Sequence, residues 1–156
     1  MSEAETAPEP STQDERTMAI LAHVLQVVGW WIAPLVIFLL NRKSRFASFH
    51  ALQALLLQLV YLVITGAFMI LWFASFFMTM AHHPADKGAP PPTALFVLFP
   101  LVWIGFMGAW VTVLVIAIMY GVKAGRGEWA EYPLLGRMAR KILKIGPGRT
   151  TLSQDS

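Results

Sequence analysis

Few side chains in this sequence can carry chemistry, and most of them lie within or beside long apolar stretches. They are His23, His50, Gln53, Gln58 and Tyr61. On a helix, His50 and Tyr61 project within about 20° of each other, and Gln53 lies within one turn of His50. Lipid leaves polar groups unpaired, so we expect these side chains to form one face directed into a helix bundle.

Two kinds of chemistry fit such a polar face. Interhelical hydrogen bonding is the preferred interpretation, at around 1 kcal/mol per contact. The alternative is a proton relay or solute path through His23 and His50, because histidine titrates near neutrality. Such paths usually include an intramembrane Asp, Glu, Lys or Arg, and the apolar stretches contain none.

A second candidate site is the adjacent pair His82 and His83, since neighbouring histidines can bind a transition metal when a third ligand is near. Only Asp86 is close, so a solvated loop is the preferred interpretation. The chain has no cysteine, no glycine-rich phosphate loop, no His-Glu-x-x-His motif and no nucleophile elbow. We therefore predict no enzyme activity, no bound metal and no cofactor.

Three apolar stretches must position these groups: Met18 to Leu40, Phe49 to Ala81 and Thr93 to Val122. None contains an acidic or basic residue, and each exceeds the roughly 20 residues that cross a bilayer. With 56% hydrophobic and 13% charged residues, a soluble core of this size would have nothing left to cover it. The fold class predicted is all-α, an integral membrane protein with three transmembrane helices. These helices are expected at about residues 18–40, 47–81 and 93–123.

The first apolar stretch allows a second arrangement. Gly29 and Pro34 can break it into an interfacial piece and a short re-entrant helix, since proline removes a backbone hydrogen bond and clashes with the preceding turn. A single crossing is the preferred interpretation. A break would place the N-terminus on the inner side.

Basic residues orient the predicted helices. The first loop carries Arg42, Lys43 and Arg45, and the segment after Val122 is also rich in Lys and Arg, whereas the N-terminal tail and the loop 82–92 carry one base each. Cytoplasmic loops carry the excess of basic residues. We expect a multi-pass protein of a cell membrane, the bacterial inner membrane, with its N-terminus outside and its C-terminus in the cytoplasm.

One membrane domain, residues 17–145, is expected between two disordered tails. Residues 1–16 contain five acids, one base and two prolines, too little apolar surface to fold. Residues 146–156 form the second tail.

In the C-terminal part of the membrane domain, the sequence predicts an amphipathic interfacial helix over residues 134–145. Its apolar residues fall on one side of a helix and Arg137, Arg140, Lys141 and Lys144 on the other. These cations, with Arg42, Lys43 and Arg45, are predicted to contact anionic lipid headgroups, at about 1 kcal/mol each near the surface. Binding of nucleic acid by the same charges is not expected.

Three blocks of the sequence carry a resemblance to a known family. They are RTMAILAHVLQVVGWWIAPLVIFLLNRK, FASFHALQALLLQ and YGVKAGRGEWAEYPL, within roughly residues 16–140. Their order and spacing resemble a bacterial family of small membrane proteins grouped as Tic-like, after the twenty-kilodalton channel subunit of the chloroplast import translocon. The resemblance implies a membrane fold and a subunit that associates with itself or with other membrane proteins.

Two functional hypotheses follow. The preferred one is a non-enzymatic structural or interaction component of the bilayer, oligomeric through Gly105, Gly108 and the polar face of the second helix. The alternative is a small channel or transporter subunit whose path is lined by His23, His50 and the glutamines Gln53 and Gln58.

Overall fold

The structure, a computed structural model, describes residues 11–82 and 93–145. The described residues form five helices and no strand. The helices are α1 (Gln13–Gly29), α2 (Ile32–Leu40), α3 (Arg45–His82), α4 (Thr93–Gly125) and α5 (Leu135–Leu143). The all-α prediction is confirmed.

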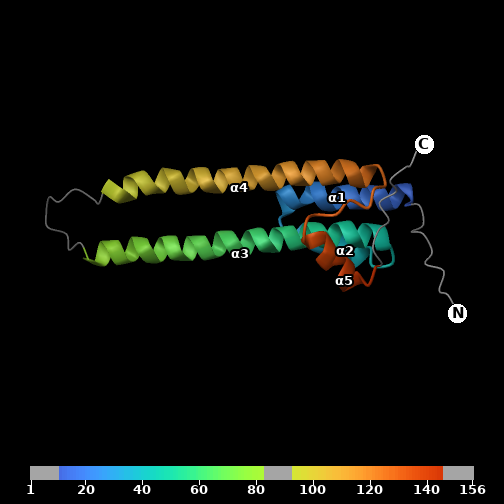
Figure 1. Cartoon of the computed structure of the whole chain (residues 1–156), viewed down its shortest axis with the longest axis horizontal. Helices are drawn as coiled ribbons and strands as arrows, with labels where there is room; N and C mark the ends of the chain where they lie inside the picture. Colours follow the sequence, from blue (N-terminus) through green and yellow to red (C-terminus); the bar gives the residue numbers. More distant parts are fainter. Residues whose placement is uncertain (1–10, 83–92, 146–156) are drawn as a thin grey trace, which may run out of the picture.

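Two of these helices dominate the molecule. α3 and α4 run side by side in opposite directions, and α1, α2 and α5 gather around the start of α3 and the end of α4 (Figure 1). The segments Arg45–Ala81 and Val97–Gly125 are long and apolar enough to cross a membrane. Among the described residues there are thus two candidate spans where the sequence predicted three.

The first apolar stretch is broken, as the alternative arrangement required. α1 ends at Gly29, and Trp30 adopts a positive φ of 49° before α2 begins at Ile32. A Cβ on Gly29 would lie 2.7 Å from the Cβ of Ala33, so the close turn requires glycine. Pro34 is the third residue of α2, where the missing N–H is one of the unpaired donors of any helix start. The break therefore lies before the proline.

The two short helices form a hairpin that returns to the end where it began. The Ser44 hydroxyl, just after α2, interacts with the carboxylate of Glu15 in the first turn of α1. The same hydroxyl accepts a hydrogen bond from the amide of Ala47 at 3.0 Å, which caps the start of α3. One serine thus joins the beginning of α1 to the beginning of α3.

Buried residues concentrate at the end of the molecule that holds the hairpin. We call this end the cap and define it as residues 11–58 and 117–145. Alanines at helix contacts let the backbones approach closely: Ala19 packs on Phe46 and Ala124, and Ala22 packs on Ala51. Beyond the cap, α3 and α4 expose large apolar side chains, such as the 68% exposed Val63 and Ile104. Apolar surfaces of this kind are compatible with contact to the hydrocarbon of a bilayer.

The structure describes part of only one of the two tails that were predicted to be disordered, the N-terminal one. Thr12 and Glu15 form a capping box, with the Thr12 amide 2.8 Å from a Glu15 carboxylate oxygen, and residues 13–16 are the first turn of α1. The expected disorder is therefore wrong for residues 13–16. Residues 1–10 and 146–156 lie outside the described residues.

Candidate functional site

A chain of hydrogen bonds crosses the centre of the cap. The Tyr132 hydroxyl lies 2.9 Å from His23 Nδ1, and His23 Nε2 lies 3.1 Å from His50 Nδ1. His50 Nε2 then lies 3.1 Å from the backbone carbonyl of Glu128. His23 comes from α1, His50 from α3 and the other two from the segment after α4, so one chain of contacts joins three parts of the fold.

The carbonyl at the end of this chain determines every proton position in it. A carbonyl only accepts, so His50 Nε2 must carry the hydrogen, and His50 Nδ1 of a neutral ring must accept. His23 Nε2 therefore donates to His50, and His23 Nδ1 accepts from the Tyr132 hydroxyl. All four ring nitrogens are occupied by protein groups.

The segment 128–132, which we call the strap, is not helical, and side chains pair several of its backbone groups. Gln53 binds it twice: its Nε2 donates to the carbonyl of Ala130 at 3.1 Å, and its Oε1 accepts from the amide of Tyr132 at 2.7 Å. The Tyr120 hydroxyl donates to the carbonyl of Glu131 at 2.9 Å. Irregular backbone is tolerated near lipid only when protein groups pair it in this way.

Burial has a clear effect on the strap tyrosine. Tyr132 is 3% exposed, and burial raises the pKa of its hydroxyl, which keeps it a neutral donor. The amide of Gln26 lies near enough to lower this pKa in part. Even so, neither polar atom of the fully buried Gln26 amide makes a hydrogen bond of normal geometry within the described residues.

Arg140, expected at the lipid headgroups, is instead part of the protein interior. It is 8% exposed, pairs with Glu131 of the strap, and stacks its guanidinium 5.0 Å from the ring of Phe49 and 5.8 Å from that of Trp129. Gly136 permits the approach of α5, because a Cβ there would lie 2.6 Å from the Cβ of Glu131. The correction follows from tertiary contact, since periodicity places Arg140 beside the other cations of α5.

The surface of α5 has three faces where the sequence predicted two. Ala139, Arg140 and Leu143 face the protein, packing near Phe49 and Leu52 of α3. Leu134, Met138 and Ile142 form an exposed apolar stripe one turn apart, and Arg137, Lys141 and Lys144 form an exposed basic stripe beside it. Arg42, Lys43 and Arg45 are also exposed.

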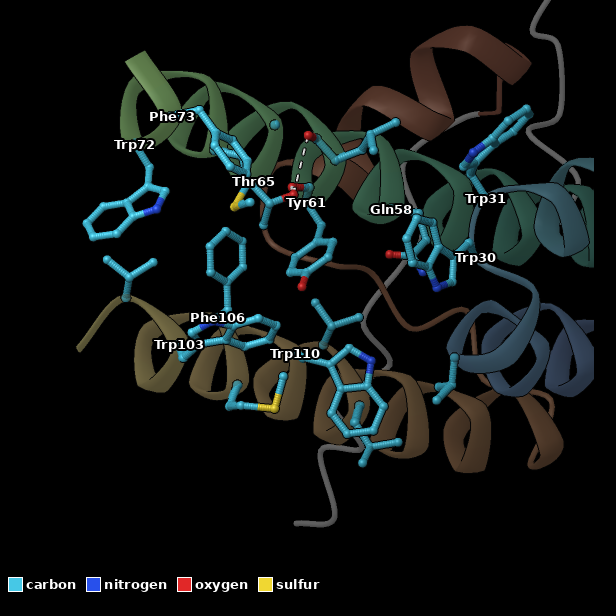
Figure 2. Close-up of a pocket in the computed structure, with 18 of the residues that line it drawn as sticks. Trp30, Trp31, Gln58, Tyr61, Thr65, Trp72, Phe73, Trp103, Phe106 and Trp110 are labelled. Atoms are coloured by element: carbon cyan, nitrogen blue, oxygen red, sulfur yellow. Dashed lines mark hydrogen bonds between the residues drawn. The ribbon is translucent and has the colours of Figure 1, made fainter. Parts of the chain in front are cut away.

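An apolar cavity lies beyond the polar chain, between α3 and α4. Its volume is about 570 Å³. Figure 2 shows aromatic rings from both helices and from the break between α1 and α2 around it. Its aromatic lining residues are Trp30, Trp31, Tyr61, Trp72, Phe73, Phe99, Trp103, Phe106 and Trp110. Gln58 also lines it and donates to the backbone carbonyl of Gln26 at 2.7 Å.

The structure thus divides the polar residues singled out in the sequence. His23, His50 and Gln53 are joined to the strap by hydrogen bonds, whereas Gln58 and Tyr61 line the aromatic cavity. The sequence did not assign Tyr120, Tyr132 or Glu131 to this site. Their partners are up to 109 positions away, and no local pattern signals such a pairing. His83 lies outside the described residues, so the proposed histidine pair stays a prediction.

Comparison with known proteins assigns a family. Residues 14–139 match the magnetosome magnetite crystal formation protein family. This match overturns the expected Tic-like resemblance. No curated protein and no solved structure matches the chain.

Proposed function

Because the chain belongs to the magnetosome magnetite crystal formation protein family, we propose that it is a non-enzymatic structural component of the magnetosome membrane. The observation that carries the proposal is that the polar side chains of the cap form hydrogen bonds to other parts of the protein. His23, His50 and Gln53 all bind protein groups, and their partners lie in other segments of the fold. They join α1, α3 and the strap into one unit.

This use of the polar groups favours a structural role over a transport path. A path needs side chains that can exchange partners with a solute or a proton, and the proposed relay ends at a backbone carbonyl, which cannot pass a proton on. Gln53 is likewise engaged at both of its amide atoms.

We place α3 and α4 across the bilayer and the α1–α2 hairpin within one side of it. The exposed bases Arg42, Lys43, Arg45, Arg137 and Lys141 all lie at the cap end, which is the cytoplasmic end by the excess of positive charge. A hairpin that returns to this end puts the N-terminus in the cytoplasm as well. This arrangement replaces the external N-terminus expected from three crossings.

α5 then lies at the cytoplasmic interface of the bilayer. Its apolar stripe, Leu134, Met138 and Ile142, faces hydrocarbon, and the adjacent basic stripe meets anionic headgroups. Self-association or binding to other membrane proteins through Gly105 and Gly108 completes the proposal. Both glycines are exposed on α4, and a Cβ at either would meet nothing within 4 Å.

The test is complementation of a deletion strain that forms magnetosomes. Wild-type protein and Gln53→Ala are each expressed with a C-terminal tag, and crystal dimensions are measured by electron microscopy. Gln53→Ala leaves the Ala130 carbonyl and the Tyr132 amide unpaired, so we expect reduced accumulation in magnetosome membranes and altered crystals.

The matched control is Ser75→Ala, because the Ser75 hydroxyl bonds only within α3, to the carbonyl of Leu71 at 2.8 Å. It should complement fully. Purified wild-type protein in proteoliposomes should show no pH-dependent ion flux. Flux that disappears in His50→Ala, or normal crystals in the deletion strain, would contradict the structural role.

A further inference from the structure

The aromatic cavity between α3 and α4 lies midway along the two long helices, and it is open at the surface, since lining side chains such as Trp103 are about half exposed. Tyr61 is 16 positions after Arg45 and 21 before His82, or about 24 Å and 31 Å along α3. Phe106 occupies a similar central place on α4 (Thr93–Gly125). With both helices across a bilayer of about 30 Å, as proposed above, the cavity lies near the midplane.

The cavity does not suit a second protein helix. Helices pack in lipid through small residues that let the backbones approach, and nine of the nineteen lining residues here are aromatic. Thr65 and Gly66 are the small exceptions. A volume of about 570 Å³ falls in the range of sites for small molecules, roughly 300 to 1,000 Å³.

Two polar atoms face this apolar space without a hydrogen-bond partner among residues 11–82 and 93–145. The Tyr61 hydroxyl makes no hydrogen bond within the described part of the chain, and Figure 2 shows it directed from α3 toward α4. The Gln58 amide uses its nitrogen on the carbonyl of Gln26, which leaves its oxygen turned to the cavity (Figure 2). In hydrocarbon an unpaired hydroxyl is unfavourable, so a ligand with an oxygen at this depth would pair it.

The depth of the cavity in the bilayer determines which ligands could place an oxygen atom there. The ester carbonyls of bilayer lipids lie at the edges of the hydrocarbon, about 15 Å from the midplane, and acyl chains at the midplane carry no oxygen. A ligand here must combine a hydrogen-bond acceptor with an apolar body that is soluble at the bilayer centre. Flat rings also stack on the indole and phenyl faces that line the site.

From these observations we propose that the cavity binds a lipid-soluble quinone, with a ring carbonyl accepting from the Tyr61 hydroxyl and the ring packed among Trp103, Phe106 and Trp110. The tail extends between α3 and α4 into the bilayer. The Gln58 oxygen accepts a hydrogen bond from the hydroxyl of the reduced form. The inference rests on the membrane placement proposed above and adds a ligand to it.

The experiment uses the full chain in detergent micelles, titrated with decylubiquinone while tryptophan fluorescence is recorded. Five of the six tryptophans line the cavity, and quinones quench indole emission on contact. We expect saturable quenching. Tyr61→Phe keeps the ring and removes the donor, so its Kd should rise about three- to tenfold, the effect of one hydrogen bond.

The matched control is Thr112→Val, which removes a hydroxyl of α4 that bonds to the Gly108 carbonyl and does not line the cavity. Its Kd should equal the wild-type value. Decylbenzene has the same tail and a flat ring without carbonyls, and it should not displace the quinone at equal concentration.

Displacement by decylbenzene or by phosphatidylglycerol, non-saturable quenching, or an unchanged Kd in Tyr61→Phe would overturn the quinone site. Circular dichroism verifies that each variant is folded. Failure of the quinone experiment with folded protein in micelles leaves the structural role standing, because that role is tested by crystal dimensions and not by ligand binding.

Discussion

At the scale of single residues, one backbone carbonyl organises the centre of the cap. The carbonyl of Glu128 makes His50 a donor, which makes His23 a donor to His50 and an acceptor from Tyr132. Each ring nitrogen of the two histidines therefore has one defined hydrogen-bonding role. Loss of one member should leave its neighbour buried and unpaired.

Tyr132→Phe tests this dependence. The change removes the donor to His23 Nδ1 without altering the packing of the ring, and an unsatisfied buried acceptor costs about 1–3 kcal/mol. We expect a lower thermal unfolding midpoint in detergent. Tyr61→Phe is the control, because its hydroxyl makes no hydrogen bond among the described residues, and it should unfold with the wild-type. Equal midpoints for all three proteins would contradict the assigned chain.

Glu15 gives a pH dependence that can be isolated. The hydrogen bond from Ser44, and then that from the Thr12 amide, lower the pKa of this carboxyl below its usual 4.5. A lowered folded-state pKa means that the stabilisation is present above about pH 4.5 and is lost as the pH falls through the folded-state value. Glu15→Gln should show a smaller decrease of unfolding temperature than wild-type between pH 6 and pH 3. Parallel curves would refute the assignment.

At the scale of the elements, the break between α1 and α2 determines how the first apolar stretch is used. Gly29→Ala would place a Cβ 2.7 Å from the Cβ of Ala33, and the backbone must shift to relieve that contact. Overpacking of this kind costs about 1–3 kcal/mol. Guanidinium unfolding in detergent should show the loss.

Gly105→Ala is the control for that substitution. It adds the same methyl group to a helix position where nothing lies within 4 Å, and alanine is the better helix former. Its stability should equal or slightly exceed that of the wild-type. A Gly29→Ala protein as stable as Gly105→Ala would mean that the turn has room the structure does not show.

α5 carries one buried cation, Arg140, and exposed cations such as Arg137, and substitutions should distinguish their contributions to stability. Arg140→Ala removes the ion pair with Glu131 and the stacking on Phe49 and Trp129, so we expect a loss of about 1–3 kcal/mol in unfolding free energy. Arg137→Ala removes an exposed charge and should change stability by less than about 0.5 kcal/mol.

The two substitutions should have the opposite order of effects on lipid binding, with the larger loss in Arg137→Ala. Retention of phosphatidylglycerol after detergent purification, measured by mass spectrometry, should decrease in Arg137→Ala, since a cation near an anionic surface contributes about 1 kcal/mol. Arg140→Ala should retain the lipid where it remains folded. The opposite order would place Arg140 at the headgroups.

At the scale of the whole molecule, the two candidate spans predict that both chain ends lie on one side of the membrane. Reporter fusions at residue 1 and residue 156 should both report the cytoplasm, because the α1–α2 hairpin returns to the end where it starts. A fusion in the loop 83–92 should report the opposite side. An external N-terminal reporter would restore three crossings and refute the hairpin as a re-entrant element.

Much of the architecture was accessible from composition and periodicity. The absence of charge over Phe49 to Ala81 and Thr93 to Val122 predicted two helices that the structure contains as α3 and α4, and the boundaries of these helices lie within two residues of the expected 47–81 and 93–123. The first stretch was less determinate, because Gly29 and Pro34 are compatible with either a kink or a turn. Only contact with Ala33 and Ser44 distinguishes the two.

What the sequence determined by itself is the type of each element, because hydrophobic runs and helical periodicity are local properties that each segment carries alone. What only the tertiary structure decided is which side chains meet. Tyr132 contacts His23, which lies 109 positions away in the sequence. Arg140 is buried because it pairs with Glu131 and stacks on Trp129. A polar group near lipid must find a partner, but its own segment does not specify which one.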